Sequence, residues 1–388
     1  MDNDYMNLIE KITPEIIKIR RQLHMYPELS LQEFGTCKLI CSFLHKIGMS
    51  YKIVANTGVV AEIINDENYP TFAIRAEMDA LPIQEETSCE YASKNGNIMH
   101  ACGHDAIVAI ALGLSYVFYE TKEKLKCNIK FIFEPGEEIG KGAKAMIKGG
   151  VLLKPKVDRI LIFHLANSLP LGMEIRKNVS TCEISSLNIK ITGKSSHWCE
   201  VNKGIDAIKA AGKVICAVSE INDTYNSKMP FVVGIGTIRG GVKTNVIAEN
   251  VEMKGTLRTF DEGDRVNICK SLSKMQQKLQ KESGSLIEVK TMPKIPSIYN
   301  DDELVTIGRR VGKSIFGKQN VTTSIKPYLA GDNAGFYFKK VKGARIVFFA
   351  EIKDEKNYPL HNSKFNFDEK IIPLAIQTIY KIIITKFQ

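Results

Sequence analysis

The sequence predicts an α/β fold in which a largely parallel sheet, covered by helices on both faces, carries an inserted α+β domain. Over the first 180 residues, short apolar strands alternate with helical segments, as in parallel α/β sheets. After about residue 180, strands with an alternating apolar pattern replace them. A chain of 388 residues is long enough for two domains. We therefore expect one domain from residues 1–180 and 294–388, interrupted by a second from residues 181–293.

The expected elements of the first domain follow from the periodicity of apolar residues. Helical spacing is found at residues 5–20 and 36–47, and a run rich in small residues, 106–119, predicts a buried helix. Four apolar runs predict strands, at residues 59–64, 71–78, 128–134 and 159–165. Two further helices, expected at 301–316 and 367–386, return the chain to this domain.

The insert shows a different order of elements. Strands are expected at residues 183–193, 231–241, 250–260 and 285–291, and helices at 205–221 and 265–283. The resulting order, β-α-β-β-α-β, is typical of the ferredoxin-like split unit.

Composition excludes several classes of protein. Apolar residues make up 44% of the chain, yet no run approaches 18 consecutive apolar residues, so no membrane span is expected. The acidic N-terminus lacks the features of a signal peptide, which predicts a cytoplasmic location. The net charge of +10 comes from dispersed lysines without an aromatic-rich basic motif, and indicates a solvated surface rather than a nucleic-acid partner. Nine irregularly spaced cysteines do not indicate a disulfide framework.

The strongest local motif is MHACGHDA at residues 99–106, just before a predicted helix. Cys102 and His104 both belong to residue types that bind borderline-soft divalent metals. Taken alone, the pair is equally a buried cysteine beside a hydrogen-bonded histidine.

A second motif, FIFEPGEEIGKGA at residues 131–143, places Glu137 and Glu138 directly after an apolar strand. Functional sites collect at the carboxyl ends of parallel strands. One of two adjacent carboxylates can bind a metal while the other accepts a proton from a bound water. Taken alone, the pair is also consistent with ordinary surface glutamates.

Four further polar residues stand out by position. Asp79 follows a strand, His164 ends one, His197 lies inside the insert, and His361 lies near the C-terminus. Each has an ordinary structural explanation, such as a hydrogen-bonded histidine in the core. Their order along the chain, with the two motifs above, is what makes them informative.

In that order the chain resembles the M20 metallopeptidase family, in its amidohydrolase branch of aminoacylases, hippurate hydrolases, auxin–amino acid conjugate hydrolases and N-acetyldiaminopimelate deacetylases. The matching segments are RRQLHMYPELSLQE (20–33), MDALPIQEET (78–87), YASKNGNIMHACGHD (91–105), EPGEE (134–138), GTIRGGVKTNVIAENVEMKGTLRT (236–259) and LHNSKFNFDEK (360–370). The resemblance implies a zinc-peptidase-like catalytic domain and an inserted lid domain that forms a homodimer.

The resemblance also implies an activity, the hydrolysis of N-acyl amino acids of acetyl or benzoyl type. It implies two divalent metal ions per chain, drawn from zinc, manganese, nickel and cobalt. The implied metal ligands are Cys102, His104, Glu138, His164 and His361.

Four more roles are implied in the same way. Glu137 would be the general base that acts on a metal-activated water, and Asp79 would orient a ligand. His197 would polarise the scissile carbonyl, and Asn245 would bind the substrate.

The chain departs from the branch pattern in places that leave all of these ligands and the base intact. The departures are Glu77, Glu134, Ile107, Val201-Asn202 and Asp332-Asn333. They therefore bear on substrate choice more than on hydrolysis. Two alternatives stay open: an M20-type dipeptidase or carboxypeptidase, and a non-catalytic small-molecule-binding protein on the same scaffold, which loss of the base or a ligand would have favoured.

Overall fold

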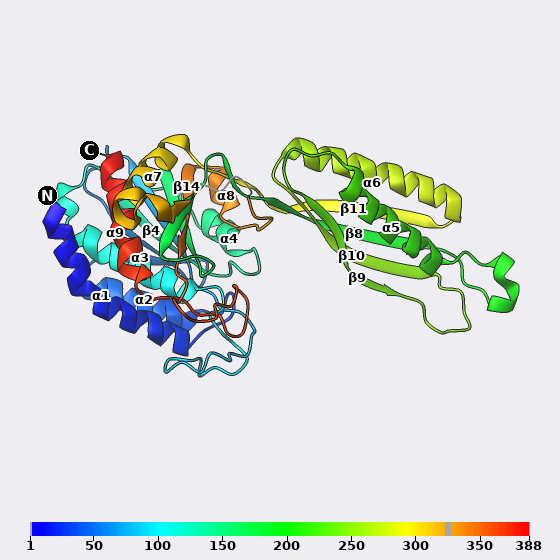
Figure 1. The fold of residues 1–388 in the computed structure, drawn as a ribbon, viewed down its shortest axis with the longest axis horizontal. Helices are drawn as coiled ribbons and strands as arrows, with labels where there is room; N and C mark the ends of the chain where they lie inside the picture. The colour runs from blue at the N-terminus through cyan, green and yellow to red at the C-terminus, as the bar shows by residue number, and fades with distance from the viewer. Residues whose placement is uncertain (1, 323–326, 388) are drawn as a thin grey trace. The chain divides into compact units, whose positions relative to one another are not determined.

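The computed structural model describes residues 2–322 and 327–387 and divides them into two compact units (Figure 1). The larger unit holds residues 2–180, 299–322 and 333–387. The smaller unit holds residues 181–298 and 327–332. The chain leaves the larger unit after residue 180 and returns after residue 298, whereas the expected return was after residue 293.

A central sheet organises the larger unit, with the strand order β1-β2-β4-β3-β5-β14-β6-β13. The strands are β1 (Ser50–Val54), β2 (Gly58–Ile63), β3 (Thr71–Glu77), β4 (Asn128–Glu134), β5 (Val157–Ala166), β6 (Gly172–Ile175), β13 (Val321–Thr322) and β14 (Lys342–Phe349). Parallel pairing joins the four central strands β4, β3, β5 and β14. The prediction of a mostly parallel sheet is therefore confirmed at its centre, while β2 and β6 run antiparallel to their neighbours β4 and β14.

Helices cover this sheet, and their packing explains the apolar runs in the sequence. They are α1 (Asp2–Met25), α2 (Phe34–Lys46), α3 (His104–Glu120), α4 (Gly142–Lys148), α7 (Asp302–Phe316), α8 (Gly335–Phe338) and α9 (Ile371–Lys386). Helix α3 is buried along almost its whole length between α1, α9 and strand β3. Every residue of β3 and β4 is buried, as expected for strands covered on both faces.

The smaller unit has the expected ferredoxin-like order of elements. Its strands are β8 (Glu183–Thr192), β9 (Val232–Gly240), β10 (Asn250–Thr259) and β11 (Leu286–Ile295), and its two long helices are α5 (Ala207–Thr224) and α6 (Glu262–Ser283). They form an antiparallel sheet in the order β11-β8-β10-β9. Both helices pack on this sheet over a separate apolar core (Figure 1).

Shorter elements complete the chain. Strands β7 (Val179–Thr181) and β12 (Ile298–Tyr299) pair with each other where the chain passes between the units, and η2 (Trp198–Lys203) is a short 3-10 helix of the smaller unit. In the part of the chain that the structure describes, no helix is both long and apolar enough to cross a bilayer.

Candidate metal centre

One edge of the central sheet collects most of the predicted site residues. Cys102 and His104 flank Gly103, whose positive φ of 80° lets the chain turn into helix α3. The two adjacent glutamates follow β4, and His164 lies near the end of β5. Strands β4 and β5 both run parallel to β3, which lies between them, so their carboxyl ends meet at this edge. His361 arrives from the loop before α9, in a left-handed conformation with φ of 65°.

The side chains at this edge lie within bonding range of shared cations. The Cys102 Sγ atom is 3.5 Å from His164 Nε2 and 3.3 Å from His361 Nε2. The Glu138 Oε1 atom is 3.5 Å from His361 Nε2 and 3.9 Å from His104 Nε2. Three overlapping groups have their ligand atoms within 4.8 Å of one another: Cys102–His104–His164, Cys102–Glu138–His361 and His104–Glu137–Glu138. Because the groups share members, the arrangement can hold two ions with common ligands.

The two inner histidines are held in the same tautomer. The Nδ1 atom of His104 donates to the carbonyl oxygen of Asp79 at 2.9 Å, and that of His164 donates to the carbonyl oxygen of Leu165 at 2.8 Å. When the ring is neutral, as a metal ligand must be, each histidine therefore presents the lone pair of Nε2 to the centre of the site. This pattern is the usual one for histidines that bind metals.

Asp79 is a buried carboxylate that organises the ligands. It accepts hydrogen bonds from the Ser30 hydroxyl at 2.6 Å and from the backbone N–H of Glu138 at 3.0 Å, and one oxygen lies 3.3 Å from His104 Nδ1. Burial alone would raise the pKa of Asp79, but these three partners lower it to about 2. Asp79 therefore stays ionised and fixes two ligands at once, His104 through its ring and Glu138 through its backbone.

The ionisation of the ligands follows from burial and neighbours. Burial raises the pKa of the Cys102 thiol to about 12, so without a cation it is a neutral thiol. Burial would also raise the pKa of Glu138, but His361 and His104 lower it below its usual value. The Glu138 carboxylate, 3.5 Å from its Nε2 atom, raises the pKa of His361. A bound divalent cation would deprotonate the thiol, as coordinating metals do.

The residues fit such ions. Among the described residues, the buried His104 Nε2 and Glu138 Oε1 atoms have no hydrogen-bond partner. A buried polar atom left unpaired costs about 1–3 kcal/mol, and a cation between them would satisfy both. A donor set of thiol, imidazole and carboxylate suits zinc, manganese, nickel or cobalt better than magnesium.

Glu137 lies beside the candidate ligands His104 and Glu138, and a backbone N–H orients its carboxylate. Its Oε1 atom accepts a hydrogen bond from the backbone N–H of Asn333 at 3.3 Å. The Asn333 side chain in turn accepts from Arg75 Nη2 at 2.7 Å. Arg75 is fully buried and also pairs with Glu134, at 2.9 and 3.1 Å, and with Glu77.

That network explains three of the departures from the branch pattern. Glu77 and Glu134 are buried partners of Arg75, and Asn333 connects the same arginine to Glu137. Ile107 is fully buried in the apolar core of α3. Sequence reasoning missed two functional contributions. Ser30 lies in a recognised motif but was assigned no role, and the Asn333 contact comes from a backbone N–H, which no side-chain pattern reveals.

The remaining two predicted residues lie in the smaller unit. His197 is exposed and forms a β-bridge with Val246, which places the neighbouring Asn245 close to it in the same unit. The His197 Nδ1 atom accepts from the backbone N–H of Cys199 at 3.2 Å, which leaves Nε2 as the donor of this ring. The structure thus brings together seven of the predicted residues in the larger unit and these two in the smaller one.

Comparisons with known proteins give the geometry a context. The model of peptidase family M20/M25/M40 matches residues 73–385. An N-acetylcysteine deacetylase of Bacillus subtilis is 33% identical and covers 93% of this chain and 94% of its own length. Thermostable carboxypeptidase 1 of Saccharolobus solfataricus is also 33% identical, over 95% of this chain and 96% of the relative. A solved dinuclear metal-binding peptidase of the M20 family from Bacillus subtilis is 29% identical, with a TM-score of 0.85 over 97% of this chain and 99% of that one.

Proposed function

The chain belongs to peptidase family M20/M25/M40, and within that family we propose that it hydrolyses N-acyl amino acids of acetyl or benzoyl type to a carboxylic acid and a free amino acid. As a member it is a metal-dependent hydrolase of amide bonds, which sets aside a non-catalytic role for this scaffold. The observation that carries the proposal is the placement of Glu137, beside the ligand groups and oriented by the N–H of Asn333. The similarity to a relative named N-acetylcysteine deacetylase supports the acyl class.

The cofactor in this proposal is a pair of divalent ions, zinc, manganese, nickel or cobalt. The residues that would hold them are Cys102, His104, Glu138, His164 and His361. When bound, such ions act as Lewis acids that polarise a carbonyl and lower the pKa of a water from 15.7 to about 7. Asp79 keeps His104 and Glu138 in position for this role.

Glu137 carries the proton in the proposed reaction. Its carboxylate accepts a proton from the attacking water, whose oxygen bonds to the acyl carbon, and delivers it to the leaving nitrogen as the C–N bond breaks. The N–H of Asn333 holds the carboxylate in one orientation through both steps. The proposal includes the two roles that the resemblance implies for the smaller unit, carbonyl polarisation by His197 and substrate binding by Asn245.

A substrate panel tests the activity. Purified protein supplied with zinc or manganese should release free amino acid from N-acetyl or N-benzoyl amino acids. Glu137→Gln should lower kcat by about 10²–10⁴-fold, because a positioned general base contributes that much, while its metal content stays unchanged. Glu10→Gln, an exposed glutamate of α1, is the matched control and should keep full activity. A fully active Glu137→Gln variant would refute the assignment of the base.

A second candidate is a peptidase activity, favoured by the similarity to a relative named thermostable carboxypeptidase. Dipeptides with a free amino group belong in the same panel for this reason. Turnover of dipeptides without turnover of N-acyl amino acids would select this candidate. The homodimer that the resemblance implies through residues 181–293 stays a prediction, and light scattering of the purified protein tests it.

A further inference from the structure

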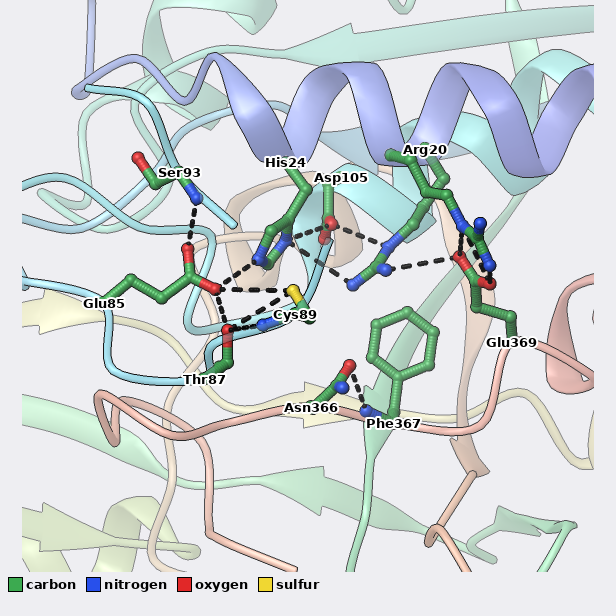
Figure 2. Close-up of polar contacts among 11 residues, drawn as sticks. Arg20, His24, Glu85, Thr87, Cys89, Ser93, Asp105, Asn366, Phe367 and Glu369 are labelled. Carbon is green, nitrogen blue, oxygen red and sulfur yellow. Dashed lines mark hydrogen bonds and ion pairs between the residues drawn. The ribbon is translucent and has the colours of Figure 1, made fainter. Parts of the chain in front are cut away.

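A second polar cluster lies in the larger unit, and none of its members is assigned to the metal centre. His24 comes from the last turn of α1, and Glu85, Thr87 and Cys89 come from the loop between β3 and α3 (Figure 2). Behind His24 lies Asp105, on the first turn of α3. The described structure therefore brings together an imidazole from α1 with a carboxylate and a thiol from the loop before α3.

The spacing of these three side chains matches a metal site. The Glu85 Oε1 atom is 3.2 Å from His24 Nε2 and 3.9 Å from Cys89 Sγ, and all three ligand atoms lie within 4.8 Å of one another. Tetrahedral zinc with bonds of about 2.0–2.3 Å separates its ligand atoms by roughly 3.3–3.8 Å. The observed distances need only small adjustments to reach that geometry. The His24 and Glu85 side chains are almost completely buried, with 2% and 3% exposed, so the site excludes most of the solvent.

The surrounding residues orient these ligands. The Nδ1 atom of His24 lies 2.7 Å from Asp105 Oδ2, which directs Nε2 toward Glu85 and Cys89. This carboxylate–histidine arrangement is the one that commonly supports a metal-bound imidazole. The backbone N–H of Ser93 donates to Glu85 Oε2 at 2.7 Å, which leaves Oε1 directed at the other two ligands.

The charges near the cluster also favour a cation. The carboxylates of Asp105 and Glu369 pair with the guanidinium group of Arg20, as Figure 2 shows, Glu369 also pairs with Arg21, and the Glu85 carboxylate faces His24. Burial would lower the pKa of His24, but Asp105 and Glu85 raise it, so a proton on the ring balances these groups until a cation takes its place. Once the imidazole is neutral, these five groups sum to one negative charge. A divalent cation bound to neutral His24 and to a Cys89 thiolate adds one positive charge and brings the sum to zero. When it enters, the cation releases the thiol proton and any proton on Nε2 of His24, so charge and atoms balance.

We propose that His24, Glu85 and Cys89 form a binding site for one divalent cation of the zinc class, distinct from the ions of the metal centre. A water would complete the tetrahedron. The Thr87 hydroxyl, which contacts both Glu85 Oε1 and Cys89 Sγ, would donate to the thiolate once Glu85 binds the cation. The site is structural. It joins the last turn of α1 to the loop that leads into MHACGHDA.

Cobalt(II) tests the site, because a thiolate ligand gives a charge-transfer band in the near ultraviolet. Cys102→Ser removes the thiol of the metal centre, so a band that persists in this variant reports another thiolate. The band should disappear in Cys102→Ser/Cys89→Ser and persist in Cys102→Ser/Cys269→Ser, since Cys269 is a partly buried thiol beside Thr291. Two outcomes overturn the proposal. One is a band that persists in Cys102→Ser/Cys89→Ser, and the other is the absence of a band in Cys102→Ser.

A second measurement needs no variant. In the unmodified protein, zinc should slow alkylation of Cys89 at least tenfold, read by mass spectrometry of its peptide. Alkylation of Cys269 should not change. Equal rates of alkylation at Cys89 with and without zinc would overturn the site, whatever the metal centre does.

Discussion

Replacing Asp79 by asparagine isolates the residue that orients two ligands of the metal centre. The change keeps the size of the side chain and removes its charge. In the folded protein the pKa of Asp79 is about 2, against an ordinary value of 3.8. A difference of nearly two units is worth about 2 kcal/mol of folding free energy at neutral pH. Because the folded state lowers this pKa, the contribution is complete above about pH 4 and is lost as the pH falls toward 2.

Urea unfolding of the metal-free protein measures this contribution. Asp79→Asn should lower the free energy of unfolding by about 2 kcal/mol at both pH 7 and pH 5, since both lie above the range where Asp79 titrates. Below pH 4 the difference in unfolding free energy between the variant and the unmodified protein should become smaller. With metal, the variant should bind zinc about 10–100-fold more weakly, the usual cost of losing a carboxylate behind a metal-bound histidine.

Two results would refute the reasoning. One is a change in unfolding free energy of less than about 0.5 kcal/mol at pH 7, the size expected of an ordinary surface substitution. The other is an unchanged affinity for zinc. Asp223→Asn, at an exposed aspartate in α5 of the smaller unit, is the matched control and should leave both quantities unchanged.

Three further predictions concern the larger unit. Cys102→Ser should lower the metal content measured by elemental analysis, because Cys102 belongs to two of the three ligand groups; full content would exclude it as a shared ligand. Arg75→Met should lower the free energy of unfolding in urea by about 3–5 kcal/mol, because it leaves Glu134 buried without its arginine partner. Adding Glu134→Gln should recover much of that loss. An Arg75→Met variant as stable as the unmodified protein would contradict this prediction. Gly142→Ala would place a Cβ atom 1.9 Å from the carbonyl oxygen of Pro135, so thermal unfolding should show a free energy of unfolding lower by about 1–3 kcal/mol. An unchanged Tm would show instead that the loop moves aside without strain.

The parts of the fold that the sequence predicted best are those where burial imposes a simple pattern. Strands β3, β4 and β5 are rich in apolar residues because both of their faces are covered, although single charged residues such as Arg75 and Lys130 are buried within them. The alternating strands of the smaller unit are equally clear, because helices cover one face of that sheet. In both cases the local pattern reports the environment of the strand directly.

Strand β14 shows where such patterns fail. Lys342 and Arg345 interrupt its apolar residues, so the segment resembles the charged surface around it, yet it lies between β5 and β6 inside the sheet. The backbone N–H of Arg345 donates to Asn300 Oδ1 at 2.8 Å, a partner 45 residues away that local sequence does not reveal. The sequence did not predict that β2 runs antiparallel to β4 either, because the direction of a short strand depends on the strand with which it pairs.

The candidate site likewise has features that the sequence predicted and features that it did not. Residue types and their order predicted candidate ligands that the fold brings together, since cysteine, histidine and glutamate carry their chemistry in the side chain. The organising contacts did not follow from the sequence. Asp79 accepts hydrogen bonds from Ser30 and Glu138 at its carboxylate and from His104 at its backbone carbonyl, and Asn333 acts through its backbone, so both depend on the folded chain.

The route of the chain through the candidate centre has a consequence for protein synthesis. His164 and His361 both contact Cys102, but nearly 200 residues lie between them, including the whole of the smaller unit as far as Ile298. At translation rates of about 5–20 residues per second, His361 is added roughly 10–40 s after His164. During that interval the nascent chain holds only part of its ligand set. The centre is therefore completed only after residues 181–298 of the smaller unit have been synthesised, and a ribosome that stalls before residue 361 leaves a product without its full set of candidate ligands.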